Sequence, residues 1–262
     1  MPDVEIHPAA IIDPEAIIGD ETKIGPYCVI SAGVQIGQGC VLHNHVSIEG
    51  TTVIGDQNTF HAHSAIGGQS QDLKYSGEPT HLEIGSQNTF REFVTVNRGT
   101  DPGNKTQVGS HGIFLAYSHI AHDCVVGDHV IFSNNGTLAG HVQMGDYAIL
   151  GGLTAVHQFC RIGPHAMTGG CSKIVQDVPP FMIADGNPAE IRSINAIGLQ
   201  RRGFADEDIR ALKEAYKTIF LRKLTVADAL AKLKNNSSGL TDDHPVQILI
   251  SFIESSERGI IR

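Results

Sequence analysis

The chain has 262 residues, of which 41% are hydrophobic and 18% charged, and its formal net charge is −9. This composition excludes a disordered chain, which needs low hydrophobicity and high charge, and argues against a broad nucleic-acid-binding surface, which needs positive charge. There is no apolar run long enough to span a membrane, no signal-peptide pattern at the N-terminus and no C-x-x-C pair among the five cysteines, so we expect a cytoplasmic protein without disulfides.

An apolar residue recurs at nearly every sixth position from Ile6 to Ile174. A smaller residue occupies the position four residues later, and a glycine often follows the large residue directly. Six residues make one short strand and one turn, so three units close a triangular coil, and coils stack about 4.8 Å apart through strand hydrogen bonds. The pattern resembles the left-handed parallel β-helix of hexapeptide-repeat proteins, which predicts a mainly β fold over residues 1–186.

The small inward positions also account for four of the five cysteines. We expect Cys28, Cys40, Cys124 and Cys160 to be packed inside the prism, because free cysteine is among the most buried residue types. Two polar, Gly/Pro-rich segments interrupt the repeat without changing its phase. These segments, at about 67–83 and 97–107, are predicted to be loops on the rigid prism, which is where functional residues often lie.

Helical patterns replace the period of six after about residue 186. Asn187-Pro188 has the form of an N-cap followed by a proline at the first helical position, which predicts a helix from there through about 203. Further helices are expected at about 205–222, at 225–235 with Thr225 as its cap, and at 244–257. Residues 187–262 are therefore predicted to form a C-terminal α-helical domain. Residues 191–262 hold 12 Lys/Arg against 9 Asp/Glu, so this domain offers a mildly basic dock for an anionic partner.

The phase of the repeat brings several histidines together. Residues 18 apart belong to one column, so His122, Gly140 and Gln158 share a column, and Asp123, His141 and Phe159 form the next one. His119 and His157 precede these columns on the same coils. All of them lie off the inward positions, so we expect them to face outward.

Three interpretations of this cluster remain open from the residues alone. It is a solvated polar face, a metal site in which imidazoles are the ligands, or a general-base site in which Asp123 orients a histidine. For the third, an imidazole with an ordinary pKa of about 6.5 is suited to accept a proton from an alcohol. Gly140 could then present its backbone N–H to an oxyanion.

Several segments closely resemble the UDP-N-acetylglucosamine O-acyltransferase family of lipid A biosynthesis. The resemblance covers almost the whole chain, from about residue 6 to the C-terminal RGIIR. The segments that carry it are QDLKYSGEPT (71–80), RGT (98–100), SHIAHDCVVG (118–127), TLAGHV (137–142), GGLTAVHQFC (151–160), GGCSKIVQDVPPFMIADGNPA (169–189) and GLQRRGF (198–204).

The resemblance implies transfer of a 3-hydroxyacyl chain from acyl carrier protein to the sugar 3-hydroxyl, by a homotrimer with sites between subunits. His122 is then the general base, Asp123 orients it, and Gly140 stabilises the oxyanion. No cofactor or metal is implied, since the phosphopantetheine thioester is a co-substrate. Acyl length is measured near Met167 and Gly170. Substrate contacts are implied for Asp72, Lys74, His119, His141, His157, Gln158, Asn195, Arg201 and Arg202.

The chain departs from the family pattern at two places. The family often has histidine before Arg-Gly-Thr, where this chain has Asn97, and often has an acid where this chain has Ile197. Neither departure affects the predicted base. Acyl chain length and the choice between a 3-hydroxyl and a 3-amino acceptor do not follow from the sequence.

Three other functions compete with this prediction. The N-acyltransferase of the same pathway carries an extra N-terminal domain, whereas the repeat here starts at residue 6. A zinc enzyme like the hexapeptide carbonic anhydrases needs a wider histidine spacing than that of His119 and His122. A scaffold without activity does not explain the set of His122, Asp123 and Gly140.

Overall fold

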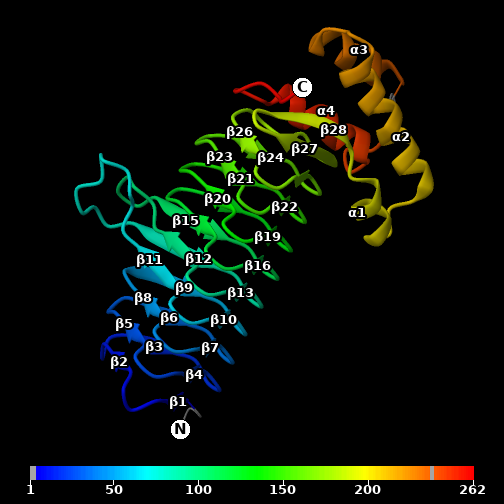
Figure 1. Cartoon of the computed structure of the whole chain (residues 1–262). Helices are drawn as coiled ribbons and strands as arrows, with labels where there is room; N and C mark the ends of the chain where they lie inside the picture. Colours follow the sequence, from blue (N-terminus) through cyan, green and yellow to red (C-terminus); the bar gives the residue numbers. More distant parts are fainter. Residues whose placement is uncertain (1–3, 237–238) are drawn as a thin grey trace.

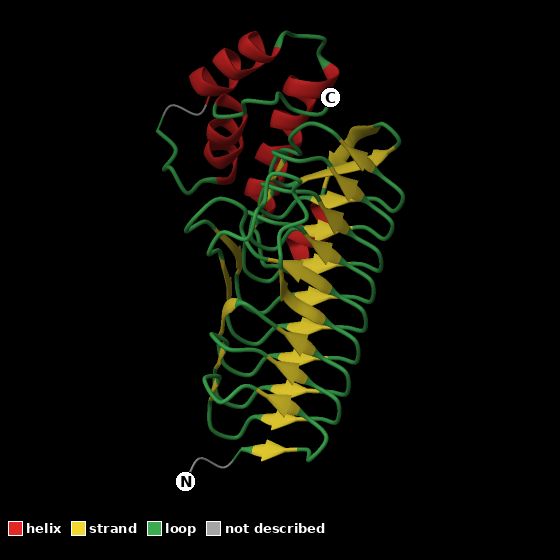
Figure 2. Cartoon of the chain, turned by 90° about the vertical axis from the view of Figure 1, so that its left-hand side faces the viewer, coloured by secondary structure: helices red, strands yellow, loops and turns green. Residues whose placement is uncertain are grey.

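A computed structural model describes residues 4–236 and 239–262 as a tall left-handed parallel β-helix with helices packed at its C-terminal end (Figure 1). Strands three apart in sequence pair in parallel, as in Glu5 with Lys23, so each face of the prism is one sheet (Figure 2). The first sheet contains β1 (Glu5–Ile6), β4 (Lys23–Ile24), β7 (Val41–Leu42), β10 (Thr59–Phe60), β13 (Thr89–Phe90), β16 (Ile113–Phe114), β19 (Ile131–Phe132), β22 (Ile149–Leu150), β25 (Met167–Thr168), β27 (Met182–Gly186) and β28 (Ala189–Ile194).

The other two faces are built in the same way. The second sheet contains β2 (Ile11–Ile12), β5 (Val29–Ile30), β8 (Ser47–Ile48), β11 (Ala65–Gly68), β14 (Thr95–Asn97), β17 (His119–Ile120), β20 (Thr137–Leu138), β23 (Ala155–Val156) and β26 (Lys173–Ile174). The third contains β3 (Ile17–Ile18), β6 (Gln35–Ile36), β9 (Thr51–Ile54), β12 (His81–Ile84), β15 (Lys105–Val108), β18 (Val125–Val126), β21 (Gln143–Met144) and β24 (Arg161–Ile162). The predicted fold class is therefore confirmed.

The core of the prism follows the predicted period of six. Phe60, Phe90 and Phe114 are fully buried, and their rings stack with centroids 4.9 and 4.6 Å apart. The four cysteines expected inside the prism are buried, and Cys171 is exposed. Thr168, which breaks the apolar pattern, still points inward with no exposed surface, and its hydroxyl accepts the N–H of Gly151.

The corners of the prism explain much of the histidine content. Six of the 14 histidines occupy corner positions in the left-handed region, with φ from 56° to 63°. Asn, Asp and His are the non-glycine residues that tolerate this region best. Successive corners stack their rings, as in His111 on His129 and His129 on Tyr147, at 4.5 and 4.6 Å. These histidines are therefore part of the corner architecture.

One predicted helix is only partly formed. The helix expected from Asn187-Pro188 through about 203 begins only at Ala196, whereas Asn187 and Pro188 turn a hairpin between the antiparallel strands β27 and β28. An Asn-Pro pair suits a tight turn as well as a helix start, and β28 completes the first sheet by pairing with β27. The first sheet thus continues to Ile194. The division into a β-helix over residues 1–186 and a helical domain over 187–262 stays a prediction.

The remaining helices match the predictions closely. They are α1 (Ala196–Arg201), α2 (Asp206–Tyr216), a π-helical turn η1 (Lys217–Leu221), α3 (Val226–Asn236) and α4 (Pro245–Glu254). Thr225 caps α3, since its hydroxyl oxygen accepts the N–H of Asp228 at 3.1 Å. Over the described ranges 4–236 and 239–262, none of the helices has the length and apolar character needed to cross a bilayer.

Candidate active site

A histidine–carboxylate pair lies at the corner that joins β17 to β18. His122 Nδ1 is 2.8 Å from Asp123 Oδ2, and the two side chains are only 9% and 6% exposed. Asp123 holds φ at 60°, the corner conformation, which places its carboxylate beside the preceding imidazole. Burial raises the pKa of Asp123, but hydrogen bonds from His122 and Thr100 lower it, and the resulting pKa lies below the ordinary value. Asp123 is therefore ionised at neutral pH.

The second loop covers this pair. The hydroxyl of Thr100 lies 2.9 Å from His122 Nδ1, and the N–H of Thr100 donates to Asp123 Oδ1 at 3.3 Å. On the other side, the N–H of Asp123 donates to the hydroxyl of Thr106 at 2.8 Å. The pair therefore lies outside the prism core, as the phase of the repeat predicts, but it is roofed by the loop and does not face open solvent.

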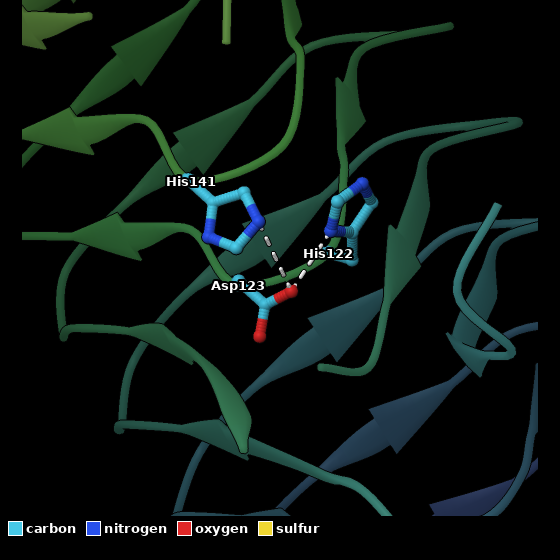
Figure 3. Close-up of side chains that lie close together, drawn as sticks. All are labelled: His122, Asp123 and His141. Carbon is cyan, nitrogen blue, oxygen red and sulfur yellow. Dashed lines mark hydrogen bonds and ion pairs between the residues drawn. The ribbon is translucent and has the colours of Figure 1, made fainter. Parts of the chain in front are cut away.

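His141 lies on the next coil, at the same corner as Asp123. Its ring stacks on Phe159 at 4.6 Å, which confirms the predicted column. Its Nε2 is 3.7 Å from Asp123 Oδ2, so the carboxylate lies between two imidazoles (Figure 3). The possible ligand atoms of these three residues lie within 4.8 Å of one another, which is close enough to hold a metal ion.

Gly140 adjoins the imidazole of His122. A Cβ at residue 140 would lie 2.3 Å from Cε1 and 2.5 Å from Nε2 of His122, closer than any real contact. The absence of a side chain therefore makes room for the ring, whose Cε1 and Nε2 lie nearest to residue 140. The chain in its described parts offers no hydrogen-bond acceptor to the N–H of Gly140.

The other two predicted histidines, His119 and His157, differ in burial and in their partners. His119 is half-buried on β17, and its Nδ1 lies 2.7 Å from the hydroxyl of Thr95. Burial and the nearby His122 lower the pKa of His119, so it is neutral at pH 7. His157 is exposed and its Nδ1 contacts the carbonyl of Gln158. In the described chain, no hydrogen bond or ion pair connects His157 or Gln158 to the pair.

The first loop approaches the pair through a hydroxyl. Ser70 Oγ lies 2.7 Å from Thr100 Oγ1 and accepts the N–H of Asp72 at 3.2 Å. The carboxylate of Asp72 in turn accepts the N–H of Lys74, whose side chain is exposed. The predicted contacts Asp72 and Lys74 therefore belong to the same local network as the histidine. Ser70 is not among the residues predicted from the sequence, and Thr100 is predicted only as part of the RGT segment.

The predicted nucleotide and acyl contacts lie elsewhere. Met167, Asn195 and Arg201 line a largely apolar groove of about 760 Å³ between the outer surface of the first sheet and the helical end. Asn195 caps α1 by accepting the N–H of Gly198. Arg202 is not part of the groove, and its guanidinium lies over the ring of Tyr147 at 4.1 Å.

The structure also locates the other residues named in the sequence analysis. Gly170 lies at a corner near the carbonyl of Gly152 and does not line the groove, whereas Ile197 does. Asn97 is buried, with its Oδ1 unpartnered. Asp123 and His141 also border a second groove, of about 770 Å³, that reaches the C-terminal segment.

Comparisons with known proteins agree with this geometry. The model of the family "Udp N-acetylglucosamine O-acyltransferase; Domain 2" matches residues 177–261, and that of the bacterial transferase hexapeptide repeats matches residues 3–37. The acyl-[acyl-carrier-protein]–UDP-N-acetylglucosamine O-acyltransferase of Akkermansia muciniphila is 56% identical over 256 residues, covering 97% of this chain and 98% of that protein.

Solved structures give the same result. The structure of LpxA from Acinetobacter baumannii is 47% identical and superposes with a TM-score of 0.93, covering 98% of this chain and 99% of that one. The UDP-N-acetylglucosamine acyltransferase of Arabidopsis is 35% identical, with a TM-score of 0.85 and coverage of 98% and 100%. The chain belongs to the UDP-N-acetylglucosamine O-acyltransferase family and is an acyltransferase.

Proposed function

We propose that this protein transfers a 3-hydroxyacyl chain from acyl carrier protein to the 3-hydroxyl of UDP-N-acetylglucosamine, in lipid A biosynthesis, with His122 as the general base. The observation that carries this proposal is the buried pair in which Asp123 holds Nδ1 of His122 at 2.8 Å. An ionised carboxylate accepts hydrogen bonds but cannot donate them, so Nδ1 carries the proton and Nε2 keeps its lone pair. This lone pair on Nε2 accepts the proton of the sugar hydroxyl.

The chemistry then follows in two steps. Nε2 of His122 takes the proton of the sugar hydroxyl as its oxygen attacks the thioester carbon, giving a tetrahedral oxyanion and an imidazolium. When the intermediate collapses, the C–S bond breaks and the imidazolium returns the proton to the leaving thiolate. Asp123 stabilises the imidazolium between these steps. A positioned general base typically contributes about 10²–10⁴-fold in rate.

Gly140 supports the proposal in two ways. Its missing side chain gives the imidazole its place, and its backbone N–H has no described acceptor. An N–H in this position is suited to donate to the oxyanion that forms at the thioester carbon. A single donor of this kind is worth about 10²–10³-fold in kcat.

The separation of the two groups of residues favours a site shared between subunits. His122 lies at the corner of the second and third sheets, whereas the groove with Asn195 and Arg201 lies against the first sheet. The two groups therefore lie on different faces of one chain. A closed homotrimer of parallel prisms, which the family resemblance implies, would bring the groove of one chain beside the histidine of the next.

The groove also suits the proposed acyl donor, which is acyl carrier protein with its acyl chain. Its lining is largely apolar, as an acyl chain requires, and it carries Arg201, Lys213 and Lys217 at its helical side. Acyl carrier protein is acidic and its arm carries a phosphate, so basic side chains beside an apolar groove match it in charge.

The proposed reaction is tested by an assay of purified protein that crosses donors with acceptors. The donors are acyl carrier proteins with 3-hydroxyacyl chains of different length, and the acceptors are UDP-N-acetylglucosamine and its 3-amino analogue, with products identified by mass spectrometry. We expect one acylated product with UDP-N-acetylglucosamine. Transfer only to the 3-amino sugar, or to neither acceptor, would contradict the proposal.

The shared site is tested by mixing subunits. His122→Ala and Arg201→Ala proteins are unfolded, mixed in equal amounts and refolded together. If the two residues meet across an interface, about a third of the sites in mixed trimers, or roughly a quarter of all sites after random mixing, are intact and activity returns. If both residues belong to one chain's site, every site keeps one defect and no activity returns.

A further inference from the structure

Thr100 and Ser70 form a buried pair of hydroxyls directly behind the histidine. Thr100 is 5% exposed and Ser70 is 9% exposed. Thr100 Oγ1 lies between two partners, 2.9 Å from His122 Nδ1 and 2.7 Å from Ser70 Oγ. The two hydroxyls come from different loops, so they join both loops to the histidine.

The hydrogen positions in the row formed by Asp123, His122, Thr100 and Ser70 follow from the neighbouring groups. Asp123 is a pure acceptor, so Nδ1 of His122 carries a hydrogen that points at Oδ2. Thr100 therefore faces Nδ1 with a lone pair, and its own O–H needs another acceptor. Ser70 Oγ, 2.7 Å away, is placed to accept it. Ser70 thus decides which way the Thr100 hydroxyl points.

We propose that Thr100 and Ser70 are positioning residues that hold His122 in the tautomer with a free Nε2 lone pair. This inference rests on the proposed role of His122 as base, and it adds a link between that base and the loop that carries Asp72 and Lys74. Ser70 Oγ accepts the N–H of Asp72, so the seating of this loop sets the hydrogen bonding behind the base and adds to the effect of Asp123 on its tautomer.

The seating of the first loop has its own anchor. Arg98, two residues before Thr100, is buried, and its guanidinium donates to the carbonyl of Gly67 at the root of that loop. A Cβ at Gly99 would meet the backbone of Asn104, so the segment between Arg98 and Thr100 has little freedom. Arg98 thus fixes the loop, and Thr100 conveys its position to His122.

Removing the two hydroxyls should lower the rate by unequal amounts, and the two losses should not add. In Ser70→Ala the Thr100 O–H loses this acceptor and competes with the hydrogen on Nδ1 of His122, which weakens the preference for the tautomer with a free Nε2 lone pair. In Thr100→Val no hydroxyl competes for Nδ1, although one hydrogen bond is lost. Adding Thr100→Val to Ser70→Ala therefore removes the competing donor and should cost nothing more.

The experiment is a double-mutant cycle on the full-length protein, with kcat, KM for the sugar nucleotide and Tm measured for each variant. We expect Ser70→Ala to lower kcat about tenfold, Thr100→Val to lower it several-fold, and the double variant to be no slower than Ser70→Ala. Thr100→Ser keeps the hydroxyl and should stay near the wild-type rate. Thr89→Val, the same change on the outer surface of the first sheet, is the matched control.

Two outcomes overturn the inference. Wild-type kcat in both single variants would show that neither hydroxyl acts on His122, and costs that multiply in the double variant would indicate independent structural roles. His122→Ala is measured beside them. If His122→Ala keeps the wild-type rate, the proposed role of His122 as base is wrong. If His122→Ala loses activity while Ser70→Ala and Thr100→Val stay fully active, only the positioning role is wrong.

A spectroscopic readout keeps the test decisive if Thr100→Val does not fold. The ¹⁵N shifts of a histidine ring distinguish its two tautomers, and the signal of His122 is identified by its loss in His122→Ala. We expect Ser70→Ala to move this signal toward the tautomer with hydrogen on Nε2. An unchanged signal would overturn the inference.

Discussion

The imidazole of His122 fills the space that a side chain at residue 140 would need, with its Nε2 within 2.5 Å of the position of a Cβ on Gly140. We therefore expect Gly140→Ala to displace the ring while leaving the prism folded. A shift of about 1 Å in a reacting group can cost about 100-fold in rate, so kcat should fall by about that factor.

Gly152→Ala is the matched control for this substitution. Gly152 occupies the equivalent turn position of another corner, and a Cβ there would meet nothing closer than 3.4 Å. Its kcat and Tm should match those of the wild type. If Gly140→Ala kept full activity, the ring would have room that the structure does not show.

Removing the charge of Asp123 should affect both rate and stability. In Asp123→Asn the amide no longer fixes the Nδ1–H tautomer of His122, and we expect kcat to fall about 100-fold or more. Because the pKa of Asp123 is below its ordinary value of 3.8, its ionised form stabilises the fold above that pH, and this contribution is lost as the pH falls through the lowered pKa. The difference in free energy of unfolding between wild type and Asp123→Asn should thus be larger at pH 7 than at about pH 3. Equal differences at both pH values would contradict this.

His165 gives a second dependence on pH. Its ring stacks between Tyr147 and Phe181, and burial, with a further effect of Arg202, lowers its pKa from 6.5 to about 4. The unfolded chain then binds a proton between these pH values that the folded chain does not, so stability should fall as pH drops from about 6.5 to about 4.

His165→Phe keeps a ring in the stack and removes this titration. Chemical denaturation across this pH range should give a shallower dependence for the variant than for the wild type. His129→Phe, the same change in the same stack, controls for the added apolar surface. An identical dependence in wild type and His165→Phe would show that His165 is not the group involved.

Asp177 attaches the C-terminal segment to the prism. It is 1% exposed, and its carboxylate accepts the N–H of Arg161 at 2.8 Å and the hydroxyl of Ser256 at 2.7 Å. Asp177→Ala leaves both donors without their partner, so we expect a loss of about 2–4 kcal/mol in the free energy of unfolding. Limited proteolysis should then cut the C-terminal segment earlier. Asp20→Ala, at an exposed corner, should change neither measurement.

The sequence allows the prism to be predicted in detail because its register repeats. Once the period of six is recognised, the inward residues of the coils from Ile24 to Ile174 follow, and so does the stacking of His141 on Phe159. The helix expected from Asn187 begins only at Ala196, because Asn187 and Pro188 also suit a hairpin turn and the pairing of β27 with β28 selects that turn.

The candidate site was only partly predictable for the same reason. His122, Asp123 and Gly140 lie on the repeating coils, so their neighbourhood follows from the spacing. Thr100 and Ser70 lie on loops, where the period of six gives no register, and only the folded loops bring them to His122. The same holds for the burial of His122, which depends on the loop above it.

The acyl-transfer rate of His122→Ala, measured with purified protein by mass spectrometry, tests the central claim most directly. His129→Ala, the same change at another corner of the prism, serves as its control, and Tm confirms that both variants fold. We predict a loss of about 10²–10⁴-fold in kcat for His122→Ala and a wild-type rate for His129→Ala. A folded His122→Ala protein that transfers the acyl chain at the wild-type rate would contradict the account.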